Sequence, residues 1–311
     1  MRMWSQNLIS VIHFFTSSNL LLTLDDSCCE RPEDMDNIIR RNDAGVISGL
    51  NFPEKLIIIA NHQIYADWMY IWFVAYLARA HGAIKILLKH SLKYLPFYGQ
   101  RKIAQDQRNI VHNLERRKKL NRPLWLVLFP EGTVISKNAR ERSQAYAEKN
   151  HLRDNRFTLL PRSTGMHLCL KTLDDGIDWI YDLTIGYPGV MPNDIPEEVL
   201  TLGKIFGQGK GPKDIHVYVR RYAVETVPKE SEAFSQWIYE RWKEKDDMMT
   251  HFYEHGRFPN FNQATQRERN NFKVPMQLQH PVIDCLKLWL CLLPYVPLVY
   301  LAKLTYTYLY L

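Results

Sequence analysis

Cysteine is scarce in this sequence, and its placement excludes two kinds of structural support. Five cysteines occur among 311 residues, and neither their odd number nor their spacing matches a disulfide framework. Paired Cys and His residues at the spacings typical of structural zinc sites are also missing. We therefore expect reduced cysteines in a cytosol-facing environment, with neither a structural disulfide nor a metal site.

Long apolar runs are also lacking, and the two candidates lie toward the ends of the chain. Residues 288–302 carry no charge, but the run is shorter than the roughly 20 residues that a perpendicular membrane span takes. Lys287 and Lys303 flank this run, and residues 304–311 extend it, so we expect a membrane anchor over 281–311. Pro294 and Pro297 would kink a helix there, and a re-entrant or interfacial segment or a buried core helix is the alternative.

The second apolar stretch, residues 8–24, is interrupted by His13 and by several polar residues. It fits a signal-like segment, an amphipathic anchor or a poor span, but no small-residue cleavage site follows it. We expect a retained membrane-associated segment, followed by a polar linker over residues 25–50.

The overall composition is that of a globular protein with a basic surface. Hydrophobic residues make up 46% of the chain, charged residues 23%, and the net charge is +7. A basic balance suits phospholipid headgroups, coenzyme A phosphates or nucleic acid. The basic residues are dispersed and a terminal anchor is expected, so nucleic acid is the least favoured of these partners.

Apolar runs rich in β-branched residues alternate with longer segments whose apolar residues are spaced for one helix face. The expected strands are residues 56–60, 83–88, 124–129, 157–160, 179–187 and 215–222. The expected helices are residues 67–79, 103–120, 143–150, 164–173 and 234–247. This order predicts an α/β fold with a mostly parallel sheet and flanking helices.

One histidine and one aspartate flank a turn between a strand and a helix. His62 follows the strand at residues 56–60, and Asp67 lies near the start of the next helix. A turn between them lets the carboxylate meet the imidazole, fix its tautomer and support a positive charge on it. The alternative for Asp67 is a helix N-cap, since a lone His-x-x-x-x-Asp spacing is common by chance.

Two further turns support the interpretation of His62 and Asp67 as a functional pair. Glu131, Gly132 and Thr133 follow the buried strand at residues 124–129. Pro161 and Arg162 precede a helix whose first backbone N–H groups suit an anion. Ligands of α/β sheets bind at the carboxyl ends of strands, so we expect the three turns to form one site. A strand-end carboxylate for Glu131 and a solvated surface side chain for Arg162 are the alternatives.

These motifs resemble the glycerolipid acyltransferase family of the lysophosphatidic acid acyltransferase type. The segments ANHQIYADWMYIW, ILLKHSLKYLPFYG, LVLFPEGT and LPRSTG are similar to the eukaryotic branch related to lysocardiolipin and lysophosphatidylinositol acyltransferases. The segments YDLTIGYPG and WKEKDDMMTHFYEHGRFP are also typical of that branch. The resemblance covers residues 56–259.

The resemblance implies an acyltransferase domain over residues 46–200, its C-terminal region over 201–265, and terminal segments over 1–45 and 281–311. One departure from the family pattern follows Gly99. The family's second motif continues for about a dozen residues to an arginine that is thought to bind the acceptor phosphate, whereas here Arg101 follows almost at once. Val134 also stands where the family often has Arg or Asn.

The implied reaction moves a fatty acyl group from acyl-CoA, a co-substrate, onto a lysophospholipid hydroxyl, with no cofactor and no metal. His62 is the general base, Asp67 orients it, and Glu131, Gly132, Thr133, Arg101, Pro161 and Arg162 bind the acceptor. The absence of a Gly-x-Ser-x-Gly motif agrees with direct transfer and no acyl-enzyme. The alternatives are an inactive membrane protein of this fold and a thioesterase. The expected location is a membrane, that of the endoplasmic reticulum first, with the mitochondrial outer membrane or a lipid droplet as alternatives.

Overall fold

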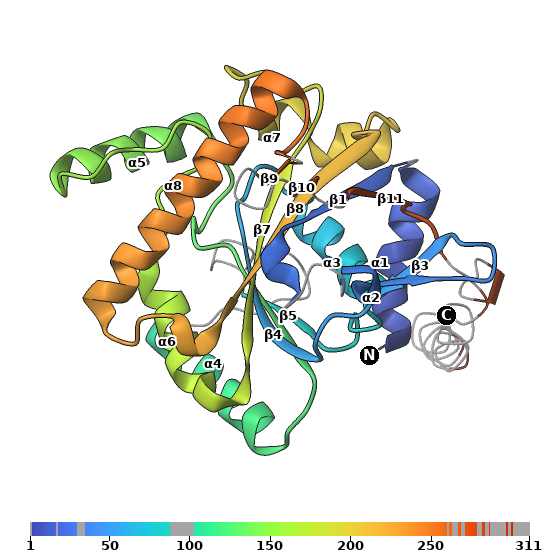
Figure 1. Ribbon diagram of the computed structural model, residues 1–311, viewed down its shortest axis with the longest axis horizontal. Coiled ribbons are helices and arrows are strands. Elements are labelled where there is room, and N and C mark those ends of the chain that lie inside the picture. The colour runs from blue at the N-terminus through green and yellow to red at the C-terminus, as the bar shows by residue number, and fades with distance from the viewer. Residues whose placement is uncertain are drawn as a thin grey trace, which may run out of the picture.

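The computed structural model describes residues 2–16, 18–29, 35–87, 103–259, 261–262, 267–268 and 271–278, and the single positions 282, 283, 286, 297 and 300. Helices lie on both sides of a seven-stranded sheet (Figure 1). The strands run β11-β1-β8-β7-β4-β6-β5 across the sheet. Their bounds are β1 Asn19–Leu24, β4 Lys55–Ala60, β5 Ile84–Ile86, β6 Leu124–Leu128, β7 Trp179–Gly186, β8 Asp214–Ala223 and β11 Asn271–Pro275.

Four of the six strand pairings are parallel, which confirms the mostly parallel sheet expected from the sequence. The neighbouring strands β5, β6, β4 and β7 all run in one direction, and β8 runs antiparallel to β7. The carboxyl ends of these four parallel strands therefore lie at one edge of the sheet, which we call the carboxyl edge. We call the opposite edge the amino edge.

Helices cover both faces of the sheet, and β4 shows why. Leu56, Ile58 and Ala60 point into one hydrophobic core, which α1 and α3 help to form. Ile57 and Ile59 point into the other, which α4, α6 and α8 help to form. A strand alternates its side chains between faces, so burial on both faces requires an unbroken apolar run. The helix bounds are α1 Arg2–Phe15, α2 Met35–Ile38, α3 Asp67–Leu77, α4 Ile103–Lys119, α5 Lys137–Lys149, α6 Ser163–Leu173, α7 Pro196–Val199 and α8 Ser231–His255.

The expectation of one apolar membrane-associated segment over residues 8–24 is wrong for its second half. The stretch divides into α1 and β1, and β1 is an inner strand of the sheet between β8 and β11. Leu20, Leu22 and Leu24 are fully buried in the core. The alternate leucines of β1 thus serve a strand face rather than a helix in lipid.

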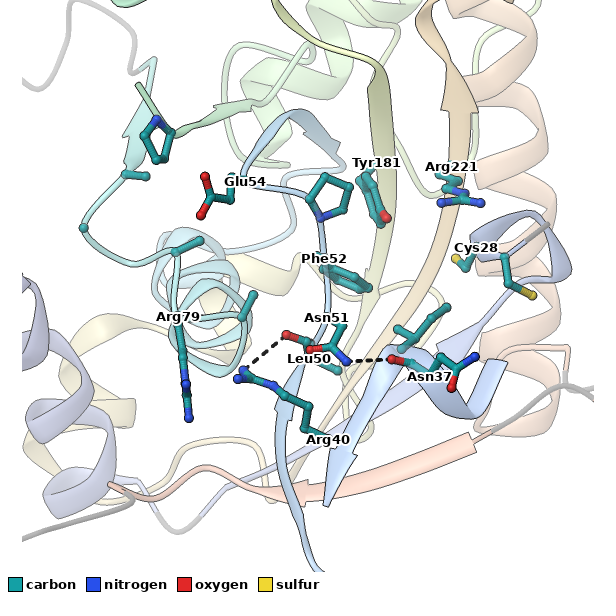
Figure 2. A pocket seen from close by; sticks show the side chains of 18 of the residues that line it. Cys28, Asn37, Arg40, Leu50, Asn51, Phe52, Glu54, Arg79, Tyr181 and Arg221 are labelled. Atoms are coloured by element: carbon teal, nitrogen blue, oxygen red, sulfur yellow. Dashed lines mark hydrogen bonds between the residues drawn. The ribbon is translucent and has the colours of Figure 1, made fainter. Parts of the chain in front are cut away.

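The polar linker expected over residues 25–50 also contains ordered structure. A short 3-10 helix, η1 (Asp26–Cys28), follows β1, and β2 (Ile39–Arg41) pairs antiparallel with β3 (Ile47–Leu50). Figure 2 shows how the chain after this hairpin is fixed, since the Asn51 side chain donates to the Asn37 carbonyl at 2.7 Å. A second small antiparallel pair joins β9 (Phe261–Asn262) and β10 (Arg267–Glu268).

Residues 157–160 do not form the expected strand. The backbone N–H groups of Arg156, Phe157 and Thr158 all donate to the Asp246 carboxylate, at 2.9, 2.6 and 2.9 Å. Those donors are taken by a side chain of α8 instead of a neighbouring strand. This arrangement makes the segment a loop that α8 holds in place.

No helix within the described part of the chain is long and apolar enough to cross a bilayer. The expected C-terminal anchor over residues 281–311 lies almost wholly outside the described residues. Within the described residues, Cys28, Cys29 and Cys169 are not joined in a disulfide.

Candidate active site

Three chain segments meet at the carboxyl edge, directly after β4, β6 and the loop at 157–162. The Ile135 N–H donates to the His62 carbonyl at 3.2 Å, and the Arg162 N–H donates to the Pro130 carbonyl at 2.8 Å. These bonds join the turn at His62 to the turn at 130–135, and that turn to the start of α6. The expectation that the three turns lie together is confirmed.

The turn after β4 begins with Asn61, whose buried side-chain amide bonds to the neighbouring strand β7 as a strand backbone would. The Asn61 side chain donates to the Ile185 carbonyl at 2.9 Å and accepts from the Ile185 N–H at 2.8 Å. Two bonds to one residue of β7 fix where the chain leaves the sheet. His62 therefore starts from a defined position.

Asp67 is fully buried, and its carboxylate accepts three hydrogen bonds. One oxygen takes His62 Nδ1 at 2.8 Å and the Ile64 N–H at 3.0 Å, and the other takes the Tyr187 hydroxyl. The N-cap of α3 is Ala66, so Asp67 is not the cap residue and its carboxylate faces the histidine. The predicted His62–Asp67 contact is confirmed.

The contact with Asp67 sets the state of the imidazole. A carboxylate that accepts from Nδ1 places the ring proton there and leaves the lone pair on Nε2. The His62 side chain is 14% exposed, so the ring is mostly enclosed but can still be approached. Its face stacks on the Phe129 ring, with centroids 4.3 Å apart, which holds the ring plane.

Glu131 lies beneath the same turn with its carboxyl group buried. One oxygen accepts from the His62 N–H at 3.3 Å and from the Trp242 indole N–H at 3.1 Å. Burial raises the pKa of Glu131 to about 8, although the Trp242 hydrogen bond works in the opposite direction. Glu131 thus holds the backbone of His62 through a hydrogen bond, and its carboxyl group does not project into solvent.

Gly132 and the Arg162 side chain lie side by side where two of these turns meet. Gly132 has a φ of +73°, a conformation that favours glycine. A Cβ added there would lie 3.7 Å from Cδ and Nε of Arg162, so the arginine side chain passes alongside this turn. Arg162 is exposed, Pro161 before it is buried, and Thr133 is half-buried.

Three residues of the site were missed by sequence reasoning. Tyr187 follows β7 and donates to Asp67, and Trp242 and Lys245 come from α8. Lys245 is fully buried, is paired with the buried Asp182 carboxylate, and donates to the Leu183 carbonyl at 2.8 Å.

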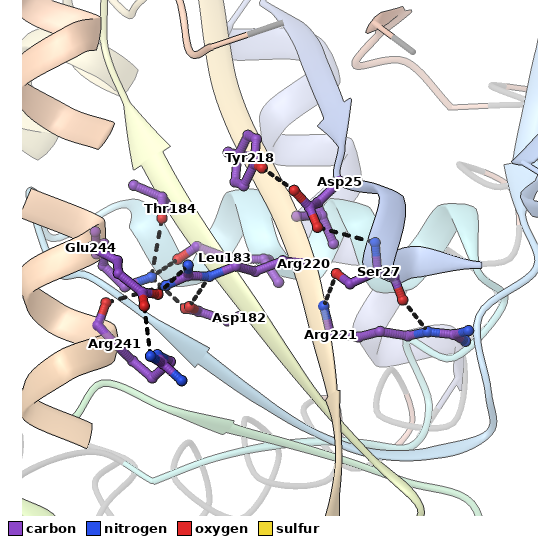
Figure 3. A network of polar contacts seen from close by, with 12 residues as sticks. Asp25, Ser27, Asp182, Leu183, Thr184, Tyr218, Arg220, Arg221, Arg241 and Glu244 are labelled. Atoms are coloured by element: carbon purple, nitrogen blue, oxygen red, sulfur yellow. Dashed lines mark hydrogen bonds and ion pairs between the residues drawn. The ribbon is translucent and has the colours of Figure 1, made fainter. Parts of the chain in front are cut away.

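Charges around Asp182 fasten α8 to the sheet behind the site. Arg220 of β8 pairs with Asp182 at 2.8 Å and with Glu244 of α8 at 2.5 Å, and Arg241 also pairs with Glu244 at 2.5 Å (Figure 3). The network fixes α8, and thereby the indole of Trp242 that donates to the buried glutamate.

One predicted site residue, Arg101, lies outside the described residues, as does the shortened segment after Gly99. Within the described ranges, no group of three or more His, Cys, Asp or Glu side chains could hold a metal ion.

The site thus belongs to an α/β protein that presents a buried aspartate, an imidazole with an open nitrogen and a glycine turn at the carboxyl edge of its sheet. Family comparison names this class. A family described as Acyltransferase matches residues 44–173, and one described as Acyltransferase C-terminus matches residues 208–282. The chain belongs to the acyltransferase family.

Individual relatives agree with this family. A 2-acyl-1-lysophosphatidylinositol acyltransferase of Saccharomyces cerevisiae is 29% identical over 85% of this chain and 77% of its own length. Lysocardiolipin acyltransferase 1 of Gallus gallus is 36% identical over 68% of this chain and 58% of its own length. An uncharacterized acyltransferase of Schizosaccharomyces pombe, C428.14, is 34% identical over 66% of this chain and 62% of its own length. The chain thus spans about three fifths of the length of the last two.

Among solved structures, the 1-acyl-sn-glycerophosphate acyltransferase PlsC of Thermotoga maritima is similar over 79% of this chain and 79% of its own. The sequence identity is 14% and the TM-score is 0.41.

Proposed function

We propose that the protein transfers a fatty acyl group from acyl-CoA to a free hydroxyl of a lysophospholipid, with His62 as the general base. The observation that carries this proposal is the hydrogen bond from His62 Nδ1 to the buried Asp67 carboxylate at 2.8 Å. It leaves His62 Nε2 as the proton acceptor in a partly enclosed site. Relatives named for lysophosphatidylinositol and lysocardiolipin acylation support this substrate class.

In the proposed reaction, His62 Nε2 takes the proton of the glycerol hydroxyl as its oxygen attacks the thioester carbonyl. The new C–O bond forms, the C–S bond breaks, and the coenzyme A thiolate takes the proton back from the imidazolium. Asp67 stabilises the imidazolium while it exists, because opposite charges in a low-dielectric site attract strongly. No step requires a covalent acyl-enzyme.

The acceptor phosphate is proposed to bind beside the glycine turn. The Arg162 side chain lies along Gly132, and Arg162 is the N-cap residue of α6, whose first backbone N–H groups suit an anion. A guanidinium suits a phosphate because its N–H groups match two phosphate oxygens. Arg101 remains a second candidate for this role.

We further propose that the carboxyl edge works against a membrane surface. In the sheet, Gly186 at the end of β7 pairs with His216, and Asn19 at the start of β1 pairs with Asp214. The end of α1, just before β1, therefore lies at the same edge of the sheet as the catalytic turn.

Exposed apolar side chains occur on the segments that meet there. They are Phe14 and Phe15 of α1, Tyr65 after His62, Met191 after β7, and Leu202. Large apolar groups left in water at one edge are typical of a surface that contacts lipid or another protein. Because the proposed substrate is a lipid, we favour a membrane over another protein as the partner of this edge. The endoplasmic reticulum is the first candidate location, with the outer mitochondrial membrane or lipid droplets as alternatives.

The experiment that tests the proposed reaction compares acyl-CoA turnover with and without a lysophospholipid. Membranes that contain the chain are supplied with acyl-CoA and a panel of lysophosphatidic acid, lysophosphatidylinositol and lysocardiolipin. Release of coenzyme A that depends on one of these acceptors, with matching formation of the diacyl product, is the expected result. Release without an acceptor would identify a thioesterase, and no release under any condition would identify a chain without turnover.

A further inference from the structure

A large cavity lies at the amino edge of the sheet, away from the catalytic turns. Its volume is about 1130 Å³, and it is lined by the segments that precede β4, β5 and β6 and follow α3. The six residues of β4 separate Glu54 of its lining from His62, which corresponds to about 20 Å at roughly 3.3 Å per residue. We call this cavity the distal pocket (Figure 2).

The lining of the distal pocket is strongly cationic. Its arginines are Arg40, Arg79, Arg117, Arg122 and Arg221, and Glu54 is the one carboxylate that lines it. None of the five arginines forms an ion pair with a carboxylate within the described part of the chain. Elsewhere in the fold the pattern differs, since Arg220 and Arg241 both have acidic partners.

The arginines come in pairs that repel one another. Burial and the neighbouring Arg79 both lower the pKa of Arg40, and burial and the neighbouring Arg122 both lower the pKa of Arg117. Like charges at short range destabilise a fold unless a counter-charge lies between them. Two such pairs around one cavity therefore suit a ligand with two anionic groups.

Arg40 is held in place with part of its hydrogen-bonding capacity unused. Its Nη2 donates to the Leu77 carbonyl at 2.7 Å and to the Leu50 carbonyl at 3.3 Å, which fixes the guanidinium at the end of α3. Its Nε is buried without a hydrogen-bond partner among the described residues. Gly49 leaves the space that this guanidinium fills, because any side chain there would collide with it.

The pocket also has an aromatic wall. The rings of Phe52 and Tyr181 lie 4.8 Å apart, and both residues line the cavity. Arg221 lies at the same wall, where its guanidinium covers the Trp179 ring at 3.9 Å and its Nε donates to the Ser27 carbonyl at 2.6 Å. Cations beside an apolar wall fit a ligand that joins phosphate to a less polar group.

We propose that the distal pocket binds a ligand that carries two phosphate groups, at a site separate from the catalytic turns. Guanidinium groups recognise phosphate through paired N–H donors, and the two arginine pairs provide one such set each. The ligand is either a soluble bisphosphate or the headgroup of an anionic lipid, and the phosphate chemistry is common to both. One bound ligand would thus connect the β2–β3 hairpin and the end of α3, which carry Arg40 and Arg79, to the end of α4, which carries Arg117.

The test measures binding to the full-length chain by calorimetry, with pyrophosphate and inorganic phosphate as probes. The test variant is Arg79→Gln with Arg122→Gln, since both side chains are exposed and no described side-chain hydrogen bond depends on them. The control is Lys149→Gln with Lys210→Gln, which removes the same charge at two exposed positions outside the pocket lining. Circular dichroism checks that each variant folds, and Arg122→Gln alone replaces the double variant if that one does not.

Saturable binding of pyrophosphate, tighter than that of phosphate, is the expected result for the parent chain. The test variant should bind pyrophosphate about tenfold or more weakly, since two charge-assisted contacts are lost, and the control should stay within about twofold. An absence of saturable binding by the parent chain would overturn the proposal, as would an equal loss in the test variant and the control.

Vesicles distinguish the two sources of the ligand. The parent chain and the test variant are sedimented with phosphatidylcholine vesicles that contain cardiolipin, whose headgroup carries two phosphate groups, with and without pyrophosphate. Binding that the test variant loses and that pyrophosphate competes for assigns the pocket to a lipid headgroup. Vesicle binding that is equal in both, together with pyrophosphate binding by the parent chain, assigns it to a soluble ligand. The readout is binding, so a failure of the proposed acyl transfer leaves this test intact.

Discussion

Replacing Asp67 by asparagine tests how the carboxylate assists His62. Both carboxylate oxygens of Asp67 accept hydrogen bonds, one from His62 and Ile64 and the other from Tyr187. An asparagine has one accepting oxygen and one donating nitrogen. The oxygen is expected to take the place of the one that accepts from the Ile64 N–H, an obligatory donor, and so to face His62 Nδ1 as well. The nitrogen is then expected to face the Tyr187 hydroxyl, which is able to accept.

Asp67→Asn should therefore keep the tautomer of His62 but remove the negative charge that stabilises the imidazolium. Opposite charges about 4 Å apart interact by about 4 kcal/mol at an effective dielectric constant near 20. A loss of that size lowers kcat by about 10³-fold, because about 1.4 kcal/mol corresponds to a factor of ten. The assay is acceptor-dependent release of coenzyme A from acyl-CoA, with the amount of folded protein matched by circular dichroism.

The matched control is Tyr187→Phe, which removes one donor to Asp67 and leaves the pair with His62 intact. We expect it to lower kcat by about tenfold at most, since one hydrogen bond to a charged group contributes about 1.5–3 kcal/mol and only part of it acts on the imidazole. If Asp67→Asn keeps kcat within fivefold of the parent, the carboxylate does not stabilise a charged intermediate of His62.

Three further predictions concern the elements around the site. The folded chain holds the Glu131 proton up to about pH 8, whereas an unperturbed glutamate releases it near pH 4.5. The free energy of unfolding should therefore fall as the pH rises from about 4.5 to about 8. Glu131→Gln should make this fall smaller, which thermal unfolding at pH 5 and pH 8 measures. Lys245→Met leaves the buried Asp182 carboxylate without one of its cations and should lower the free energy of unfolding in urea by about 3–5 kcal/mol. Phe14→Asp with Phe15→Asp should weaken binding to phospholipid vesicles by about tenfold or more, because two exposed apolar side chains become charged.

Each of these predictions has an outcome that contradicts it. The same pH dependence in the Glu131→Gln chain would show that another group holds the proton. An unchanged urea midpoint for Lys245→Met would show that the network does not fasten α8. Vesicle binding equal to that of the parent would remove the end of α1 from the membrane-facing surface.

The elements that sequence patterns predicted best are those whose cause is local. Residues 55–60 form β4 because an unbroken apolar run fits a strand buried on both faces, and Asp67 begins α3 directly after the turn. The contact between His62 and Asp67 was predictable for the same reason, since only four residues separate them and the strand before them fixes the turn.

The remaining features depend on contacts between distant parts of the chain. Tyr187 lies 120 residues from Asp67, and Trp242 lies 111 residues from Glu131, so no local pattern assigns these hydrogen bonds. The residues themselves occur in the segments YDLTIGYPG and WKEKDDMMTHFYEHGRFP, which were recognised as family motifs without a role for either side chain. The structure supplies those two roles.

The same limit explains the errors. Residues 19–24 are apolar enough for a membrane segment, and only their pairing with β8 and β11 makes them a strand. Residues 157–160 have the composition of a strand, but the Asp246 carboxylate takes the backbone donors that a strand would use.

The most direct test of the proposed function is the acyl-transfer rate of His62→Ala in membranes that hold equal amounts of variant and parent. Within the described part of the chain, the imidazole hydrogen-bonds to Asp67 and stacks on Phe129 without bonding to a strand, so the variant is expected to fold and to sediment with membranes as the parent does. A loss of about 10²–10⁴-fold in acceptor-dependent coenzyme A release is the result we predict, as general base catalysis contributes that much. A rate within a factor of two of the parent would contradict the assignment of His62 as the base.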